Sequence, residues 1–355
     1  MQILLFIIPF LLIGISIVLI SVAISFQLKF FRIASSDRLL AAFLLAGANI
    51  IFATLLLSEL HSISVSGYLF SQLGVLVLSV VFARRFCKDS TGGLTVEKAR
   101  TRVARLGDIP HCEIEEIIFV ALFLVVALVT LVSLFLALYV PPGSYDAMTH
   151  YLSRVGYWHQ YGSLRQYYTN ELRQVLGAPN AGILILWLVT FLKSDLLAGT
   201  LQWIAYVVTG LAIYRTAINL GSTRRASIFA ALIFMSLPKL VMHSSSTHID
   251  IVYTAFTLIA FYFFHRGVKL KRYGYIVLSS IGFAVALGTS GAVFYALPAL
   301  IIATLALTRT FNMSRVYYIR FVAITVFFFL LLSSYNYIQN YSGFGSFFGP
   351  RTFIG

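Results

Sequence analysis

The residues best suited to chemistry gather in two short stretches of an otherwise apolar chain. In the first, residues 139–177, Asp146, His150 and Arg154 follow one another at intervals of four. On a helix this spacing places a carboxylate, an imidazole and a guanidinium on one face. A carboxylate there could take a proton from an attacking hydroxyl, while a cation neutralises an anionic leaving group. Periodicity alone favours a simpler interpretation, in which Asp146 caps the helix and the other two are solvated.

The first stretch also has an apolar stripe, which predicts an amphipathic helix lying on a bilayer. The stripe consists of Met148, Tyr151, Leu152, Val155 and Trp158. Further along, Tyr161, Tyr167 and Tyr168 either anchor the chain at lipid headgroups or stack on sugar rings. Both interpretations of these tyrosines stay open.

The second stretch, residues 239–250, contains Lys239, His243, His248 and Asp250 with four hydroxyl side chains between the two histidines. Three explanations compete. Asp250 can cap the helix that follows. The histidines and the acid can bind a metal together with ligands from the first stretch. Alternatively, Lys239 and the histidines can hold a phosphate. Capping is the simplest of the three.

The elements that position these residues are membrane spans. The chain has 355 residues, 59% hydrophobic and only 11% charged, with a mean hydropathy of +0.90, which excludes an ordinary soluble domain. We expect an all-α polytopic membrane protein of about ten transmembrane helices, with juxtamembrane amphipathic helices in the first large outer loop. The predicted spans are 3–28, 39–58, 67–83, 115–139, 196–214, 225–242, 250–265, 273–288, 291–308 and 316–338.

The net charge of +14 follows from topology and does not indicate nucleic acid. With the N-terminus outside, most of the 26 Lys and Arg fall in cytoplasmic loops, as the positive-inside rule requires. Both chemically promising stretches then lie outside. Residues 178–192 are apolar but too short to span, and we interpret them as an interfacial or re-entrant helix. No acid or base lies deep inside a predicted span, which argues against an ion-coupled transporter.

Five sequence patterns together resemble the GT-C superfamily, and more narrowly the bacterial membrane glycosyltransferases grouped with protein mannosyltransferases and lipid A aminoarabinose transferases. They are YDAMTHYLSRVGYW from Tyr145, YTNELRQ from Tyr168, QW at Gln202, GSTRR from Gly221 and STHID from Ser246. The similarity runs from about residue 115 to 345. It divides the chain into three additional N-terminal helices (1–83), a basic cytoplasmic linker (84–114), a GT-C-like catalytic module (115–340) and an outer C-terminal loop (341–355).

The resemblance implies an inverting glycosyltransferase at the outer face of the bacterial cytoplasmic membrane. Its donor would be a polyprenyl-phosphate-linked sugar, and its acceptor a lipid, glycan or protein. Asp146 and Asp250 correspond to the catalytic acids of the family. The residues expected to bind substrate are His150, Arg154, Arg173, Lys239 and His248.

Some members of the family place a divalent metal ion at the phosphate. Its candidate ligands here would be His150, His248 and Asp250; no other cofactor is expected. One departure concerns Ser290, which stands where relatives often carry a lysine. The alternative functions are a non-catalytic transporter or flippase component for lipid-linked glycans, and a structural membrane subunit.

Overall fold

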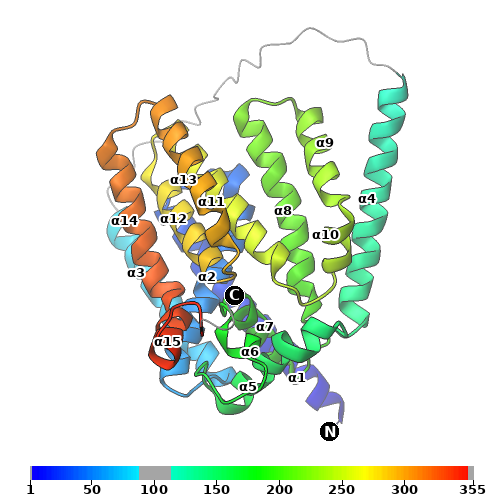
Figure 1. Cartoon of the computed structure of the whole chain (residues 1–355), viewed down its shortest axis with the longest axis vertical. Coiled ribbons are helices and arrows are strands. Elements are labelled where there is room, and N and C mark those ends of the chain that lie inside the picture. The colour runs from blue at the N-terminus through cyan, green and yellow to red at the C-terminus, as the bar shows by residue number, and fades with distance from the viewer. Residues whose placement is uncertain (1, 88–112, 351–355) are drawn as a thin grey trace.

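The computed structural model describes residues 2–87 and 113–350, and within them every regular element is a helix (Figure 1). Eight of these helices are long and apolar enough to cross a membrane. This confirms the all-α polytopic architecture. The eight are α1 (Gln2–Phe30), α2 (Arg38–Glu59), α3 (Val65–Cys87), α4 (Glu113–Tyr139), α8 (Gly199–Leu220), α11 (Asp250–Leu270), α13 (Val293–Thr310) and α14 (Arg315–Leu332). Most of the predicted linker, 84–114, lies outside the described residues.

Two of the predicted spans are not long helices. The segment 273–288 forms α12 (Tyr273–Leu287), which is only 15 residues long. The segment 225–242 is broken into α9 (Arg224–Met235) and α10 (Pro238–His243). The break has a simple cause, because Pro238 lacks an amide proton and its ring would clash with a preceding helix turn. Proline is well tolerated as the first residue of a new helix, which is where it stands.

Five shorter helices collect at one end of the bundle, which we call the loop end (Figure 1). They are η2 (Ala147–Tyr151), α5 (Leu152–Tyr161), α6 (Arg173–Leu176), α7 (Asn180–Leu192) and α15 (Ser334–Phe344). The last of these extends past residue 341 and ends at Gly345, which has a φ of +67°, so the start of the predicted C-terminal loop is helical.

Helix α7 is the short apolar segment predicted as interfacial or re-entrant. It is almost wholly enclosed by protein, with Asn180, Ile183 and Leu186 all 0% exposed. It packs against α1, α2 and α5, and so does not lie flat on a bilayer surface. Asn180 donates to the Val285 carbonyl and to the Ser333 hydroxyl, which ties α7 to the ends of α12 and α14.

At the opposite end, one fully buried acid joins the N-terminal helices to the rest of the bundle. Asp37 is 0% exposed and accepts hydrogen bonds from Tyr262 at 2.6 Å and Tyr275 at 2.7 Å. Its carboxylate also pairs with Arg215 at 2.7 Å and Arg266 at 3.3 Å. A buried carboxylate needs such partners because burial alone would strongly disfavour its charge. The three additional helices are therefore fastened to α8, α11 and α12.

Candidate active site

The first predicted site residues stand on a helix that changes its winding. Residues 147–151 form a π-helical turn before α5 continues as an ordinary α-helix. A π-turn adds about one residue, which rotates the following helix by about 100°. Met148, predicted on the apolar stripe, lies within the π-turn and is 58% exposed, whereas Val155 and Trp158 of the same stripe are buried. Arg154, predicted on the polar face, is only 6% exposed.

Asp146, at the start of this π-turn, has three basic side chains near it. One carboxylate oxygen lies 3.5 Å from Nη1 of Arg173 and 3.9 Å from Nδ1 of His150. The other lies 3.9 Å from Nδ1 of His248, which comes from the second stretch. The Asp146 side chain is still 40% exposed, so it remains accessible to a substrate. The structure thus brings the two predicted stretches together at this carboxylate.

Arg173 is held in place by a neighbouring acid. Its Nε and Nη2 donate to the two carboxylate oxygens of Glu171 at 2.8 and 3.0 Å. This fork-to-fork pairing lowers the pKa of Glu171 to about 2, chiefly through the hydrogen bonds from Arg173. The Arg173 guanidinium is therefore fixed in position, and its third nitrogen, Nη1, points to Asp146.

The second carboxylate of the site, Asp250, begins α11 and lies 3.6 Å from Nδ1 of His243. The ring of His243 stacks on that of His248, with centroids 4.2 Å apart and planes at 12°. Because His248 also faces Asp146, the two acids are joined in a series through two stacked imidazoles. We call Asp146, Arg173, His243, His248 and Asp250 the carboxylate–imidazole cluster.

Two imidazole nitrogens of the site are buried without a hydrogen-bond partner among the described residues, Nδ1 of His150 and Nδ1 of His243. Burial lowers the pKa of both side chains, and a neighbouring basic group lowers each further. That group is Arg173 for His150 and the His248 imidazole for His243. Both residues therefore favour the neutral form, in which a ring nitrogen can accept a proton or a hydrogen bond.

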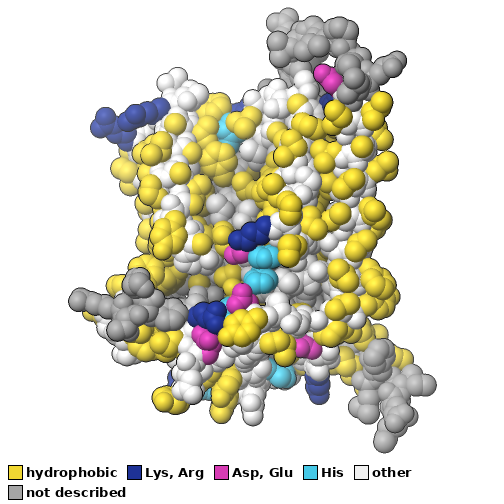
Figure 2. Space-filling view, turned by 45° about the vertical axis from the view of Figure 1, so that its right-hand side comes forward, with side chains coloured by type: hydrophobic (Ala, Val, Ile, Leu, Met, Phe, Trp, Pro, Cys, Tyr) yellow, Lys and Arg dark blue, Asp and Glu magenta, His cyan; other side chains and the backbone are white. Residues whose placement is uncertain are grey.

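Lys239 stands on α10 and is exposed; its charge reaches His243 and helps to lower the pKa of that side chain. Figure 2 shows that acids, histidines and cations gather in one strip on this face of the molecule, bordered by apolar side chains. The predicted substrate-binding cations Arg173 and Lys239 thus both belong to the same region as the two acids.

Arg154 occupies a different environment from the one predicted. Its guanidinium is buried, donates to the carbonyls of Gly177 and Ala178 at 2.8 and 3.0 Å, and lies 4.4 Å from the ring of Trp158. Burial lowers its pKa to about 10, which still leaves the group protonated at neutral pH. With its nitrogens directed to the chain that enters α7, Arg154 positions this loop, and we do not include it in the substrate site.

The predicted metal ligands do not form a ready shell. His150 and His248 face Asp146, whereas Asp250 faces His243. Across residues 2–87 and 113–350, no group of three or more His, Cys, Asp or Glu side chains has an arrangement that could hold a metal ion.

Spacing does not single out two residues of the site. His243 lies within the second stretch, but its bridging position depends on the turn between α10 and α11 that stacks it on His248. Glu171 is one charge among the tyrosines, two residues from Arg173. The sequence signal for each is its nearness to a predicted site residue.

Comparison with known proteins shows that part of this chain resembles one protein family. The family model described as dolichyl-phosphate-mannose-protein mannosyltransferase matches residues 178–333. The match begins just before α7 and includes Lys239, His243, His248 and Asp250, while Asp146 and Arg173 precede it. No curated protein and no solved structure matches the chain significantly. The predicted resemblance is thus confirmed for residues 178–333, where the chain is similar to the dolichyl-phosphate-mannose-protein mannosyltransferases.

Proposed function

We propose that this chain is an inverting glycosyltransferase that moves a sugar from a polyprenyl-phosphate donor to an acceptor hydroxyl. One observation carries the proposal. Two half-exposed carboxylates from separate loops, Asp146 and Asp250, are joined by stacked imidazoles at one end of an apolar helix bundle. The family match supports a lipid-linked donor of this kind.

The reaction needs one base and one site for a leaving phosphate. The acceptor hydroxyl attacks the anomeric carbon, the bond from that carbon to the phosphate oxygen breaks, and the hydroxyl proton passes to Asp146. The bond electrons leave with the lipid phosphate, which is already acidic and needs no proton. Attack opposite the leaving group inverts the anomeric centre.

Arg173 and Lys239 are suited to stabilise the phosphate, because both are accessible cations beside the two acids. Helix α10 presents Leu237 at its N-cap and Met242 near its end with exposed fractions of 46% and 75%. The polyprenyl chain can lie against these apolar side chains while its phosphate meets Lys239. Such a donor would enter sideways from the bilayer.

We place the reaction at the extracytoplasmic face of a bacterial cytoplasmic membrane. The distribution of charge supports this orientation, because the basic residues between consecutive spans concentrate at the end opposite the loop end. Cysteines introduced at Tyr168 in the loop end and at Lys271 in the opposite end test this orientation. An impermeant thiol reagent added to intact cells should label the first position alone.

The proposal is tested by incubating membranes that contain the full chain with radiolabelled polyprenyl-phosphate mannose, glucose or arabinose. We expect label to move from at least one donor into a membrane acceptor, at an unchanged rate in EDTA. Membranes without the chain provide the background.

Three outcomes would count against this account. If no donor supports transfer above background, the proposed enzyme is wrong. If the labelled lipid crosses the bilayer without transfer of its sugar, a flippase component is the correct function. If EDTA abolishes transfer and added Mg²⁺ or Mn²⁺ restores it, the reaction needs a metal ion, and the roles given to Arg173 and Lys239 alone are insufficient.

A further inference from the structure

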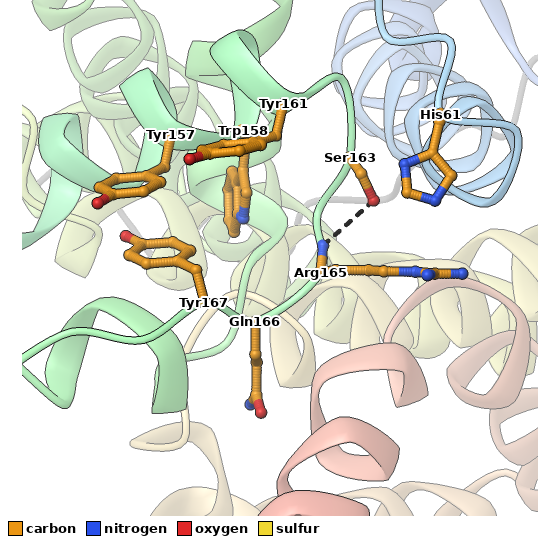
Figure 3. Close-up of a pocket in the computed structure, with 8 residues that line it drawn as sticks. All are labelled: His61, Tyr157, Trp158, Tyr161, Ser163, Arg165, Gln166 and Tyr167. Carbon is orange, nitrogen blue, oxygen red and sulfur yellow. Dashed lines mark hydrogen bonds between the residues drawn. The ribbon is translucent and has the colours of Figure 1, made fainter.

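A second site lies at the loop end, away from the carboxylate–imidazole cluster. It is a cavity of about 300 Å³ between α5 and the turn that joins α2 to α3 (Figure 3). None of the cluster residues lines it. Its volume is at the small end of the range for ligand pockets, which suits one sugar-sized group.

The aromatic wall of the cavity is preorganised. Tyr157 stacks on Tyr167 with ring centroids 3.8 Å apart and planes at 6°. Tyr161 lies nearly parallel to Tyr157, at 9° with centroids 5.7 Å apart, and Trp158 completes the wall. The hydroxyl of Tyr167 donates to Gln174 at 3.0 Å, which fixes that ring from behind. The three tyrosine rings in Figure 3 therefore stack as one set, in which Tyr157 and Tyr161 remain accessible, at 38% and 65% exposed.

The opposite wall comes from the N-terminal helices. His61 has a φ of +48°, a left-handed conformation that is costly for a residue with a side chain. A hydrogen bond joins this turn to the end of α5, since the amide of Ile63 donates to the carbonyl of Gly162 at 3.3 Å. A Cβ on Gly162 would lie 3.3 Å from the His61 carbonyl oxygen, so glycine permits this close approach. The amide of Leu164 also donates to Ser58 at 2.8 Å.

The chemistry of the lining suits a pyranose. Flat aromatic faces stack on the C–H face of a sugar ring, while the exposed Arg165 can donate hydrogen bonds to its hydroxyls. Among the described residues, those that line the cavity include no acid. A tyrosine that only anchors headgroups would resemble Tyr168, which is 94% exposed and stands outside the cavity.

We infer that this cavity binds a pyranose unit of the acceptor. The assignment of the sugar to the acceptor rests on the proposed function, whereas the binding itself does not. A physical path joins the two sites, since Tyr167 contacts Gln174 and Gln174 donates to the carbonyl of Thr149, the residue before His150. On this basis, the turn containing His61 gives the additional N-terminal helices a share in acceptor binding.

Saturation-transfer NMR on the full chain in lipid nanodiscs, without sugar-based detergent, tests the inference. The probes are the methyl pyranosides of glucose, galactose and mannose, and mannitol serves as an acyclic polyol without a ring face. We expect transfer to the ring protons of at least one pyranoside and none to mannitol. Tyr161→Ala should weaken that binding about tenfold, the scale of one aromatic contact, and Tyr161→Phe should retain it.

Tyr168→Ala is the matched control, because it removes an exposed tyrosine of the same loop that does not line the cavity. The inference is wrong if no pyranoside binds the wild type, if mannitol binds equally, or if Tyr161→Ala and Tyr168→Ala behave alike. Because binding is measured without turnover, a failure here leaves the transferase test unaffected. A failure of that test likewise leaves the pyranoside result standing.

Discussion

Three side chains lie near the Asp146 carboxylate, and each is held in a different way. Arg173 is fixed by Glu171, His150 follows on the same π-turn, and His248 arrives from a second loop. Residue type and spacing were enough to predict most of this group, because carboxylates and imidazoles are rare in an apolar chain. The pairing of His243 with Asp250 depends on tertiary structure and could not be read from spacing.

Glu171 orients Arg173 through two hydrogen bonds, so its charge should matter for donor binding. We expect Glu171→Gln to raise KM for the polyprenyl-phosphate sugar about tenfold, equivalent to about 1.4 kcal/mol, with a smaller effect on kcat. Steady-state kinetics measure both. Glu59→Gln changes an exposed acid at the same end and should leave KM unaltered; equal effects of the two would argue against the role of Glu171.

The two partly buried imidazoles of His150 and His243 predict a pH dependence of stability. Their pKa values are lowered from the ordinary 6.5, so the folded chain binds fewer protons than the unfolded chain as the pH falls through that value. Linkage then decreases the free energy of unfolding between about pH 7 and about pH 5. Thermal unfolding across this range should show a smaller loss of stability for His243→Asn than for wild type. Parallel curves would contradict a contribution from His243.

At the scale of single elements, local irregularities explain the incorrect details of the sequence prediction. Arg154, predicted on the polar face, lies in the interior against the ring of Trp158, and the π-turn at 147–151 interrupts the uniform α-helical winding on which the predicted faces depend. Pro238 divides a predicted span into α9 and α10. Proline was a readable signal, whereas the π-turn depends on packing that a single sequence does not reveal.

Arg154 should support the element that follows it. Arg154→Met removes donors from the Gly177 and Ala178 carbonyls, each worth about 1.5–3 kcal/mol as a hydrogen bond to a charged group. We expect a clear decrease in the melting temperature of the purified protein. Arg165→Met alters an exposed arginine of the same loop and should change the melting temperature little. Similar melting temperatures for the two variants would mean that Arg154 does not stabilise the entry to α7.

For the whole molecule, hydropathy and charge predicted the class of fold, since the apolar runs and the side that carries the cations need no tertiary information. How the N-terminal helices join the others was not predictable. Asp37 lies just before a predicted span, where the sequence indicates no partner for it, and it pairs with residues more than 170 positions away. The cavity wall at His61 depends on the same long-range packing.

Asp37→Ala should loosen the N-terminal helices from the bundle. It leaves Arg215 and Arg266 without their buried carboxylate, and breaking such a pair costs about 3–5 kcal/mol. We expect a lower melting temperature together with faster proteolysis between α1–α3 and the remainder. Asp195→Ala, at an exposed acid, is the control. If both variants have the same melting temperature, the contacts of Asp37 do not hold the N-terminal helices to the rest of the bundle.

The central claim is that Asp146 accepts the proton of the attacking hydroxyl, and the most direct measurement is the sugar transfer rate of Asp146→Asn. Asparagine keeps the size of the side chain and removes its basicity. We predict that kcat falls by about 10²–10⁴-fold, while Asp195→Asn, at the exposed acid, retains the wild-type rate. An Asp146→Asn protein that is folded and transfers sugar within a few-fold of wild type would contradict the account.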